Sequence, residues 1–249
     1  MPGLDAVQTL AREPETRCSS IHPLLAGDAG SIGGALSGGG DRLGAALRPG
    51  AKRALDLLGA GALLLLALPV FLAIALLVRL DGGRVFYAHP RVGRGGRLFG
   101  CLKFRSMVTD ADRRLAALLE SDPAARAEWD ATRKLKNDPR VTWVGRVLRA
   151  SSLDELPQLI NVLKGEMSLV GPRPVQAAEL AAFYGAAAQH YLSVRPGITG
   201  PWQVSGRNDT SYAQRVALDV AYATRPSLLE DVKILLRTPL AVLARRGAY

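Results

Sequence analysis

The most constraining feature of this sequence is a long apolar run in its first third. Residues 57–78 contain no charged side chain, and the run is bordered by Lys52 and Arg53 on one side and by Arg79 on the other. As one straight helix, these 22 residues would be about 33 Å long, close to the roughly 30 Å hydrocarbon layer of a bilayer. The run therefore predicts a membrane helix.

Pro69 lies in the middle of this run and predicts a kink in the helix. An interior proline removes a backbone hydrogen bond and clashes with the preceding turn, at a cost of about 3 kcal/mol. Basic residues favour the cytoplasmic leaflet and its anionic lipids, and here they flank both ends of the run. Two topologies follow from the residues alone. One is a single crossing with a tolerated proline kink, and the other is a re-entrant helix that enters and leaves through one face.

The chain is basic, and its charge is unevenly distributed. It contains 32 Lys and Arg against 22 Asp and Glu, yet residues 1–50 contain four arginines and five acids. The basic excess therefore lies in the remainder of the chain. Such a surface suits anionic lipid, phosphorylated substrates or nucleic acid, and charge alone does not choose among them. Two cysteines, Cys18 and Cys101, provide no disulfide framework and are typical of a reducing compartment.

The sequence divides into three parts. Residues 1–50 are glycine-rich and are predicted to be disordered, residues 51–80 form the membrane helix, and residues 81–249 form a cytoplasmic domain. The fold class expected for this domain is α/β, irregular and mostly helical. The predicted elements are strands over 84–87 and 98–104 around a glycine turn, helices on both sides of Asp122-Pro123 within 109–135, helices over 141–149 and 153–163, a strand over 167–170, a helix over 175–191, a loop over 195–208, and helices over 212–223 and 228–246.

The most concentrated chemical signal lies in residues 151–174. Five apolar residues of this segment fall on one helical face, whereas Asp154 and Glu155 fall off it. Ser152 is a natural N-cap, which would place both carboxylates in a first helical turn, where backbone N–H groups and the helix dipole attract anions. The spacing Ser152-x-x-Glu155 also matches an ordinary capping box. Spacing alone therefore fits both a structural and a catalytic role.

Two adjacent carboxylates repel each other by about 4 kcal/mol at 4 Å and an effective dielectric of about 20, which a divalent cation would relieve. Mg²⁺ usually binds through one or two carboxylates together with substrate phosphates. Arg149 and Arg173 lie near this pair in the sequence, and arginine binds the remaining phosphate oxygens well. A carboxylate is ionised at pH 7 and needs no general base to act as a nucleophile. This combination favours transfer of a phosphorylated group.

Several motifs occur in a fixed order from residue 52 to the C-terminus. They are Lys-Arg at 52–53, Val-Phe-Tyr at 85–87, Arg-Val-Gly at 91–93, Lys-Phe-Arg-Ser-Met at 103–107, Ser-Leu-Asp-Glu-Leu-Pro-Gln-Leu at 152–159, Gly-Pro-Arg-Pro at 171–174 and Arg-Pro-Gly-Ile-Thr-Gly at 195–200. With these motifs the chain resembles the bacterial sugar transferases, the monotopic phosphoglycosyl transferases that start exopolysaccharide and glycan assembly. It is similar to the short exopolysaccharide galactose- or glucose-phosphate transferases. The resemblance does not extend to residues 1–50.

The resemblance implies transfer of a sugar 1-phosphate from a UDP-sugar to undecaprenyl phosphate, with UMP released through a covalent phosphosugar on an aspartate. Matched by motif, Asp154 is implied as the nucleophile, with Glu155 beside it as the ligand of Mg²⁺. The residues implied to lie at the substrate phosphates are Lys103, Arg149, Arg173 and Arg207.

The resemblance also implies a location. Pro69 would be the kink of a re-entrant helix, and amphipathic helices would rest at the cytoplasmic face of the inner membrane. Lys52, Arg53 and Arg79 would then flank the membrane near anionic lipid. Leu68 departs from the family, in which serine often precedes this proline. The sugar and the oligomeric state, a homo-oligomer included, stay open.

Two other functions fit the charge. A membrane-tethered nucleic-acid binder would need a helix-turn-helix pattern, zinc spacing or interleaved aromatics, and the chain has none, so no nucleic-acid partner is expected. A scaffold would recruit glycan enzymes through residues 1–48. Trp202 fits three roles equally from sequence: a core residue, an interfacial anchor or a ring that stacks on uridine.

Overall fold

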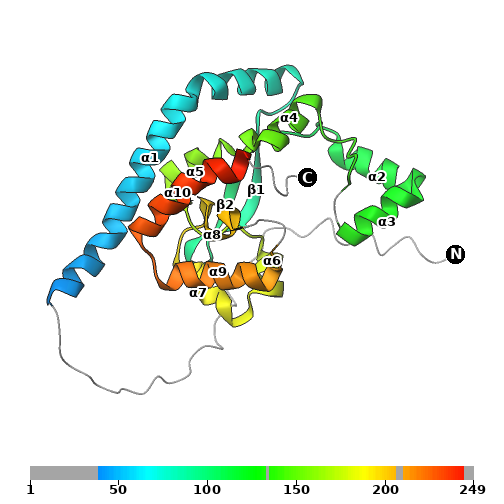
Figure 1. Ribbon diagram of the computed structural model, residues 1–249. Coiled ribbons are helices and arrows are strands. Elements are labelled where there is room, and N and C mark those ends of the chain that lie inside the picture. Colours follow the sequence, from blue (N-terminus) through cyan, green and yellow to red (C-terminus); the bar gives the residue numbers. More distant parts are fainter. Residues whose placement is uncertain (1–38, 133–134, 206–209, 244–249) are drawn as a thin grey trace. The chain divides into compact units, whose positions relative to one another are not determined.

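A computed structural model describes residues 39–132, 135–205 and 210–243 (Figure 1). Within them the chain is mostly helical with two small sheets, which confirms the expected fold class at this level. The helices are α1 (Gly39–Leu80), α2 (Ala111–Ser121), α3 (Pro123–Thr132), α4 (Trp143–Ser151), α5 (Gln158–Lys164), α6 (Ala177–Phe183), α7 (Ala188–Ser193), α8 (Pro201–Val204), α9 (Tyr212–Thr224) and α10 (Leu228–Leu243). The strands are β1 (Phe86–Val92), β2 (Leu98–Phe104), β3 (Ser168–Val170) and β4 (Gly197–Thr199).

The predicted membrane helix lies within α1, which is helical over 42 residues and includes Pro69. Its segment Gly50–Leu80 is long and apolar enough to cross a membrane by length and composition. The ribbon of α1 changes direction in its second half, at the top of the view in Figure 1. α1 begins at Gly39, so helix is present over part of the segment that was expected to be disordered.

One face of α1 packs on the rest of the domain. Ala60, Phe71, Ile74 and Val78 are buried, at spacings close to whole helical turns. The opposite face is apolar and exposed, which in water would be an unusually large uncovered patch. Its most exposed members, each between 58% and 80% exposed, are Leu58, Leu65, Leu66, Leu72, Leu76 and Leu80.

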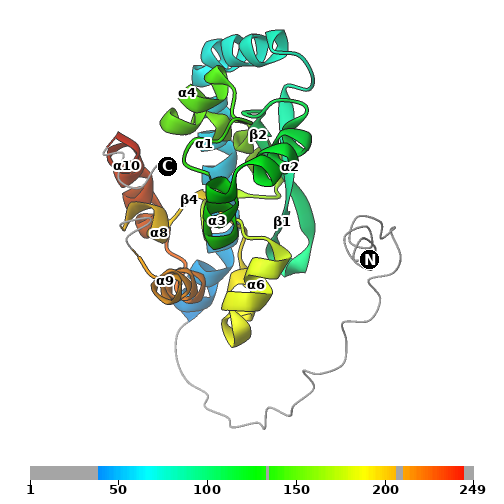
Figure 2. The ribbon, with the colours of Figure 1, turned by 90° about the vertical axis from the view of Figure 1, so that its right-hand side faces the viewer.

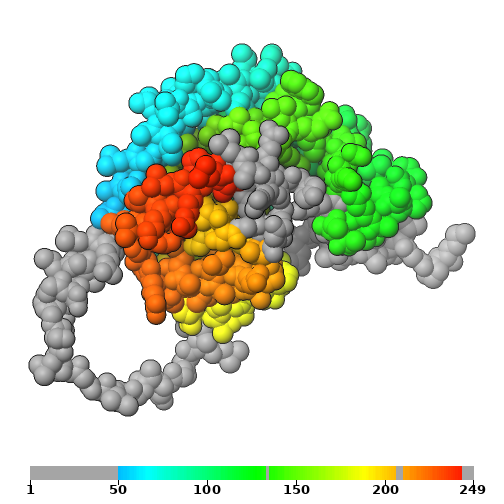
Figure 3. Space-filling model, in the orientation of Figure 1, coloured from blue at the N-terminus to red at the C-terminus, as the bar shows by residue number. Residues whose placement is uncertain are grey.

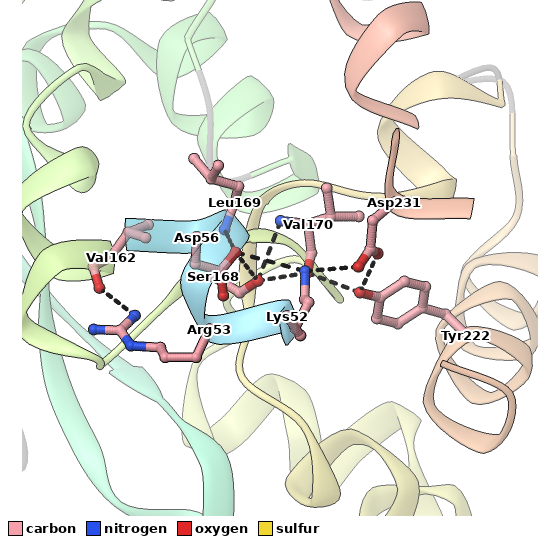
Figure 4. A network of polar contacts seen from close by, with 9 residues as sticks. All are labelled: Lys52, Arg53, Asp56, Val162, Ser168, Leu169, Val170, Tyr222 and Asp231. Atoms are coloured by element: carbon pink, nitrogen blue, oxygen red, sulfur yellow. Dashed lines mark hydrogen bonds and ion pairs between the residues drawn. The ribbon is translucent and has the colours of Figure 1, made fainter. Parts of the chain in front are cut away.

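Arg53, which is expected to flank the membrane, also forms hydrogen bonds within the protein. Its guanidinium donates to the carbonyl oxygens of Val162 at 2.7 Å and Leu163 at 3.0 Å, at the end of α5 (Figure 4). The last carbonyls of a helix lack partners within it, so they need donors from elsewhere. Arg79 differs, because it is exposed at the other end of α1 and donates to the carbonyl oxygen of Gly83.

Lys52 is also held inside the protein. Its ammonium lies 3.0 Å from the carbonyl oxygen of Val170, 3.0 Å from Asp231 Oδ2 and 3.6 Å from Asp56 Oδ1 (Figure 4). Both carboxylates are buried, and Asp56 also accepts hydrogen bonds from Ser168. Two buried carboxylates require a compensating cation. The start of the apolar segment Gly50–Leu80 is therefore bonded to the domain. Figure 3 shows α1 beside α10 on one face of the molecule.

β1 and β2 form the predicted hairpin, which is antiparallel, with Phe86 opposite Phe104 and Val92 opposite Leu98. The first strand was expected over 84–87, but β1 begins two residues later and extends to Val92. In the second sheet, β3 was predicted but its partner β4 was not. β3 pairs in parallel with β4, which lies in a segment expected to be loop. A strand of three residues has no readable periodicity. It forms here because Gly171 and Gly197 let two backbones approach closely, where an added Cβ would collide.

Two helices expected to be continuous are broken. The segment expected to be helical over 153–163 consists of a 3-10 turn, Leu153–Glu155, followed by α5. Pro157 separates the two parts, since it has no N–H to continue the ladder. Likewise, the segment 175–191 divides into α6, a 3-10 turn and α7 at Gly185, which adopts a φ of 46°.

Candidate active site

Three of the expected site residues meet where β2 passes the 3-10 turn Leu153–Glu155. Lys103 Nζ lies 2.7 Å from Glu155 Oε1 and 3.5 Å from Asp154 Oδ2. Lys103 comes from a strand whose neighbouring residue Phe104 is buried, so the lysine side chain is directed to the other side of the hairpin. The two carboxylates therefore share one ammonium group.

The backbone around the acidic pair is unusual. Ser152 has a φ of 58°, and it is the one non-glycine residue with positive φ among the residues that the structure describes. It ends α4 and makes no side-chain capping bond, so the expected N-cap and capping box are wrong. The pair lies in a single 3-10 turn between two helices, so it gains little from a helix dipole. Residues held in such conformations cost about 1–3 kcal/mol and cluster at functional sites.

The electrostatics of the pair are set by burial and by nearby cations. Asp154 is 8% exposed, and burial raises the pKa of its carboxyl group. Lys103 and Arg149 act in the opposite direction, whereas Glu155 raises this pKa further. Burial disfavours the charged form of Lys103, but Glu155 and Asp154 outweigh it and raise the pKa of the ammonium. The lysine is therefore protonated and favours an ionised Asp154.

Arg149 and Arg173 reach the site from two other elements. Arg149 lies in the last turn of α4, and its Nε donates to Ser106 Oγ at 2.9 Å. Arg173 follows β3, is exposed, and interacts electrostatically with Glu155. Lys103, Glu155 and Arg149 thus act on the pKa of Asp154, and Glu155 acts on that of Arg173. Arg207 lies outside the described residues.

The site lies beside α1. A hydrophobic cluster joins Phe71, Ile74 and Val78 of α1 to Phe104 of β2 and Leu148 of α4. These last two residues lie next to Lys103 and Arg149 in the chain. Both ribbon views place α4 beside the second half of α1 (Figure 1, Figure 2). The elements that carry the site are therefore packed directly on the apolar helix.

A second charged cluster, which the sequence did not predict, borders Arg173. Glu179 Oε1 accepts from Tyr212 Oη at 2.7 Å and from Arg215 Nη1 at 3.3 Å, and Glu179 Oε2 lies 3.6 Å from Arg91 Nη1. Burial opposes ionisation of Glu179, but these partners lower its pKa. Two guanidinium groups and one hydroxyl group thus contact one carboxylate. Their residues lie in three elements distant in sequence, β1, α6 and α9, so spacing gave no signal.

The carboxylates of Asp154 and Glu155 fit Mg²⁺ only if substrate phosphates supply further ligands. Among the described residues, no group of three or more His, Cys, Asp or Glu side chains could hold a metal ion. Asp154 and Glu155 offer two carboxylates, which matches the usual binding of Mg²⁺ together with substrate phosphates rather than in a protein cage.

Comparison with known proteins agrees with these motifs. Residues 47–245 match the family described as bacterial sugar transferase. The exopolysaccharide production protein ExoY of Rhizobium meliloti (strain 1021) is 55% identical over 200 residues, which are 80% of this chain and 88% of that protein. The undecaprenyl-phosphate galactose phosphotransferase of Salmonella typhimurium (strain LT2) is 52% identical over 198 residues, 80% of this chain and 41% of that longer protein.

A third relative extends the range of named sugars. The UDP-glucose:undecaprenyl-phosphate glucose-1-phosphate transferase of Caulobacter vibrioides is 41% identical over 207 residues, 80% of this chain and 72% of that protein. The match to the family covers α1 from residue 47 and every element that carries the site. The chain belongs to the bacterial sugar transferase family.

Proposed function

We propose that this protein transfers a sugar 1-phosphate from a UDP-sugar to undecaprenyl phosphate and releases UMP, at the cytoplasmic face of the inner membrane. The observation that carries this proposal is the buried carboxylate of Asp154 with Lys103 within ion-pair distance, on elements packed against an apolar helix. The names of the Salmonella and Caulobacter relatives both contain undecaprenyl phosphate.

The reaction divides into two displacements at one phosphorus atom. In the first, an oxygen of Asp154 forms a bond to the phosphorus that carries the sugar, and the bond from that phosphorus to the bridging oxygen of UMP breaks. In the second, a phosphate oxygen of undecaprenyl phosphate attacks the same phosphorus, and the bond to Asp154 breaks. The nucleophile is already ionised, so neither step requires a general base.

The surrounding residues supply positive charge where the reaction needs it. Lys103 favours the ionised form of Asp154, against the effect of burial. Arg149 and Arg173 are placed to hold phosphate oxygens and to offset the repulsion between the carboxylate and the diphosphate. Mg²⁺ held by Glu155, Asp154 and substrate phosphates would neutralise further charge on the diphosphate.

A re-entrant α1 is the topology that these contacts support. The start of its apolar segment is bonded to the domain through Lys52 and Arg53. Near its other end, the carbonyl oxygen of Val78 accepts from Arg105 at 2.9 Å. A helix that crossed the bilayer would carry one of these ends about 30 Å away, whereas both ends here contact one domain.

Two further helices suit the membrane interface in this proposal. Trp143 and Val147 lie one turn apart on α4 and are 70% and 51% exposed. Along α10, exposed apolar side chains recur on one face while Ile234 is buried on the other. Amphipathic helices of this kind bind at the boundary of headgroups and acyl chains. The exposed residues on α10 are Leu229, Val232, Leu236 and Leu240.

The decisive experiment replaces Asp154 by asparagine, which keeps the shape and removes the nucleophilic charge. Purified protein in lipid nanodiscs would be incubated with Mg²⁺, undecaprenyl phosphate and a panel of UDP-sugars, and UMP release would be measured. We expect turnover of Asp154→Asn to fall by a factor of about 10³ or more. We also expect no covalent adduct when the wild type forms one from a radiolabelled UDP-sugar without acceptor.

The matched control is Asp112→Asn, at an exposed position in α2. It should leave turnover and adduct formation unchanged. Adduct formation by Asp154→Asn at the wild-type rate would contradict the proposed nucleophile.

A further inference from the structure

Trp202 carries two guanidinium groups on its indole ring. The Cζ atom of Arg173 lies 5.3 Å from the ring centroid, and that of Arg215 lies 4.8 Å from it. The ring is also held by its own polar atom, because Nε1 donates to Thr210 Oγ1 at 2.6 Å. Guanidinium groups bind the faces of tryptophan more strongly than those of other aromatic residues. The contact therefore has the chemistry of a specific support rather than of general packing.

Arg215 is the inner member of this stack. Its side chain is 6% exposed, and its Nε and Nη2 atoms have no hydrogen-bond partner among the residues that the structure describes. Its ion pair with Glu179 involves Nη1 at 3.3 Å. A buried guanidinium N–H group without a hydrogen-bond acceptor costs free energy. The ring faces of Trp202 and Tyr212, at 4.8 Å and 4.9 Å, are the contacts that compensate this buried cation.

Arg173 is the outer member of the stack, and it is exposed. The ring of Trp202 is the sequence-distant group that contacts its guanidinium. Arg173 forms no hydrogen bond or ion pair with the residues that the structure describes. An unsupported arginine loses rotamer freedom when it binds a phosphate, and a stacked arginine has lost part of it beforehand. Glu155 of the acidic pair is among the charged groups that act on the pKa of this guanidinium, and it raises that pKa.

We infer that Trp202 is a positioning residue: its indole ring holds Arg173 in the orientation that binds a phosphate of the nucleotide sugar, and buried Arg215 fixes the ring from within. This inference rests on the proposed function. It gives Trp202 a role that differs from the three considered from the sequence. The ring acts through Arg173 and does not itself contact the reacting atoms.

The first test compares Trp202→Leu with Trp202→Phe. Both variants lose the bond from Nε1 to Thr210, but only phenylalanine keeps an aromatic face. We expect Trp202→Leu to lower kcat/KM for the UDP-sugar by about five- to thirty-fold, and Trp202→Phe to recover most of this loss. Inhibition by UMP should weaken in parallel, while kcat/KM for undecaprenyl phosphate should stay within about two-fold of the wild type. Equal losses in both variants would overturn the inference.

The second test combines Trp202→Leu with Arg173→Met. If the ring acts through Arg173, Trp202→Leu should cost less than about two-fold in the Arg173→Met background. Losses that multiply would show that Trp202 acts independently of Arg173, which refutes the inference and leaves the proposed function intact. An Arg173→Met variant with wild-type kinetics for the UDP-sugar would instead refute the phosphate role of Arg173, and this inference with it.

Discussion

At the scale of single residues, the site depends on the balance that burial and Lys103 set for Asp154. Burial raises the pKa of this carboxyl group, and Lys103 is the largest influence that lowers it. A raised pKa means that Asp154 is protonated, and therefore not nucleophilic, over a wider range of acidic pH. Lys103 narrows that range.

Replacement of Lys103 by methionine should therefore move the acidic limb of the pH–rate profile to higher pH. Methionine fills a similar volume but cannot stabilise the carboxylate, so the pKa of Asp154 rises further. The measurement is kcat/KM for the UDP-sugar as a function of pH. Lys164→Met, at an exposed position on α5, is the control and should leave the limb unchanged. A limb that moves to lower pH in Lys103→Met would contradict this account.

Asp219 is a second carboxylate whose pKa is raised by burial. It is 1% exposed, its Oδ2 accepts from Tyr184 Oη at 2.7 Å, and burial raises the pKa of its carboxyl group to about 6. Because the folded protein binds this proton more tightly than the unfolded chain, the contribution of Asp219 to stability is full below about pH 4. It is lost as the pH rises through about 6.

Asp219→Asn should remove this pH dependence. At pH 8 the variant should be more stable than the wild type by up to about 3 kcal/mol, and below pH 4 the difference should disappear. Asparagine keeps an oxygen that accepts from Tyr184. The measurement is denaturant unfolding of both proteins across this pH range, followed by circular dichroism. A constant difference between pH 4 and pH 8 would show that Asp219 does not titrate in this window.

At the scale of elements, the sequence predicts the helices and strands that depend on short-range patterns. The hairpin was predicted from two short strand-like segments around a glycine turn. β2 begins and ends where it was predicted to, whereas β1 ends five residues beyond the predicted strand. β4 was missed because its partner β3 lies 27 residues or more away, and three residues carry no pattern of their own. Ser152 was misread as an N-cap because its left-handed backbone is imposed by the helices on both sides.

The same limit applies to the site. Asp154 and Glu155 stood out because adjacent carboxylates near arginines are chemically distinctive. The pair formed by Trp202 and Arg215 did not, because α8 and α9 approach each other only in the folded molecule. The buried bonds of Lys52 were missed for the same reason, since a basic residue before an apolar run is typical of a membrane flank.

The topology of α1 can be tested directly with cysteines at Gly50 and Arg84, near the two ends of its apolar segment and both exposed. A re-entrant helix should leave both positions accessible to a membrane-impermeant maleimide in inverted vesicles, and neither in right-side-out vesicles. Cys18 would be replaced by alanine, while Cys101 is buried and serves as an internal negative control. Labelling of one position in each preparation would establish a crossing helix instead.

At the scale of the whole molecule, the bond between Lys52 and Asp231 joins the first described helix to the last. Asp231 is 2% exposed and also accepts from Tyr222 Oη at 2.7 Å. Lys52→Met would leave Asp231 and Asp56 buried without their cation, and we expect it to lower the free energy of unfolding by about 3 kcal/mol.

The companion variant Asp231→Asn distinguishes the energy of the ion pair from the effect of lost packing. The double variant Lys52→Met with Asp231→Asn should be less destabilised than the sum of the two single changes, as measured by thermal unfolding in detergent. Lys233→Met, which breaks an exposed pair with Glu230 on α10, should cost less than about 0.5 kcal/mol. Strict additivity of Lys52→Met and Asp231→Asn would argue against a coupled pair.

The packing of α1 has a consequence for how this enzyme can be divided. Phe104 and Leu148, next to Lys103 and Arg149 in the chain, pack against Phe71, Ile74 and Val78 of α1. Cutting the chain at residue 81 would remove these contacts and expose Phe104 and Leu148. We therefore expect a fragment that begins at residue 81 to lose activity. We also expect a foreign helix in place of α1 to restore activity only if it rebuilds this packing.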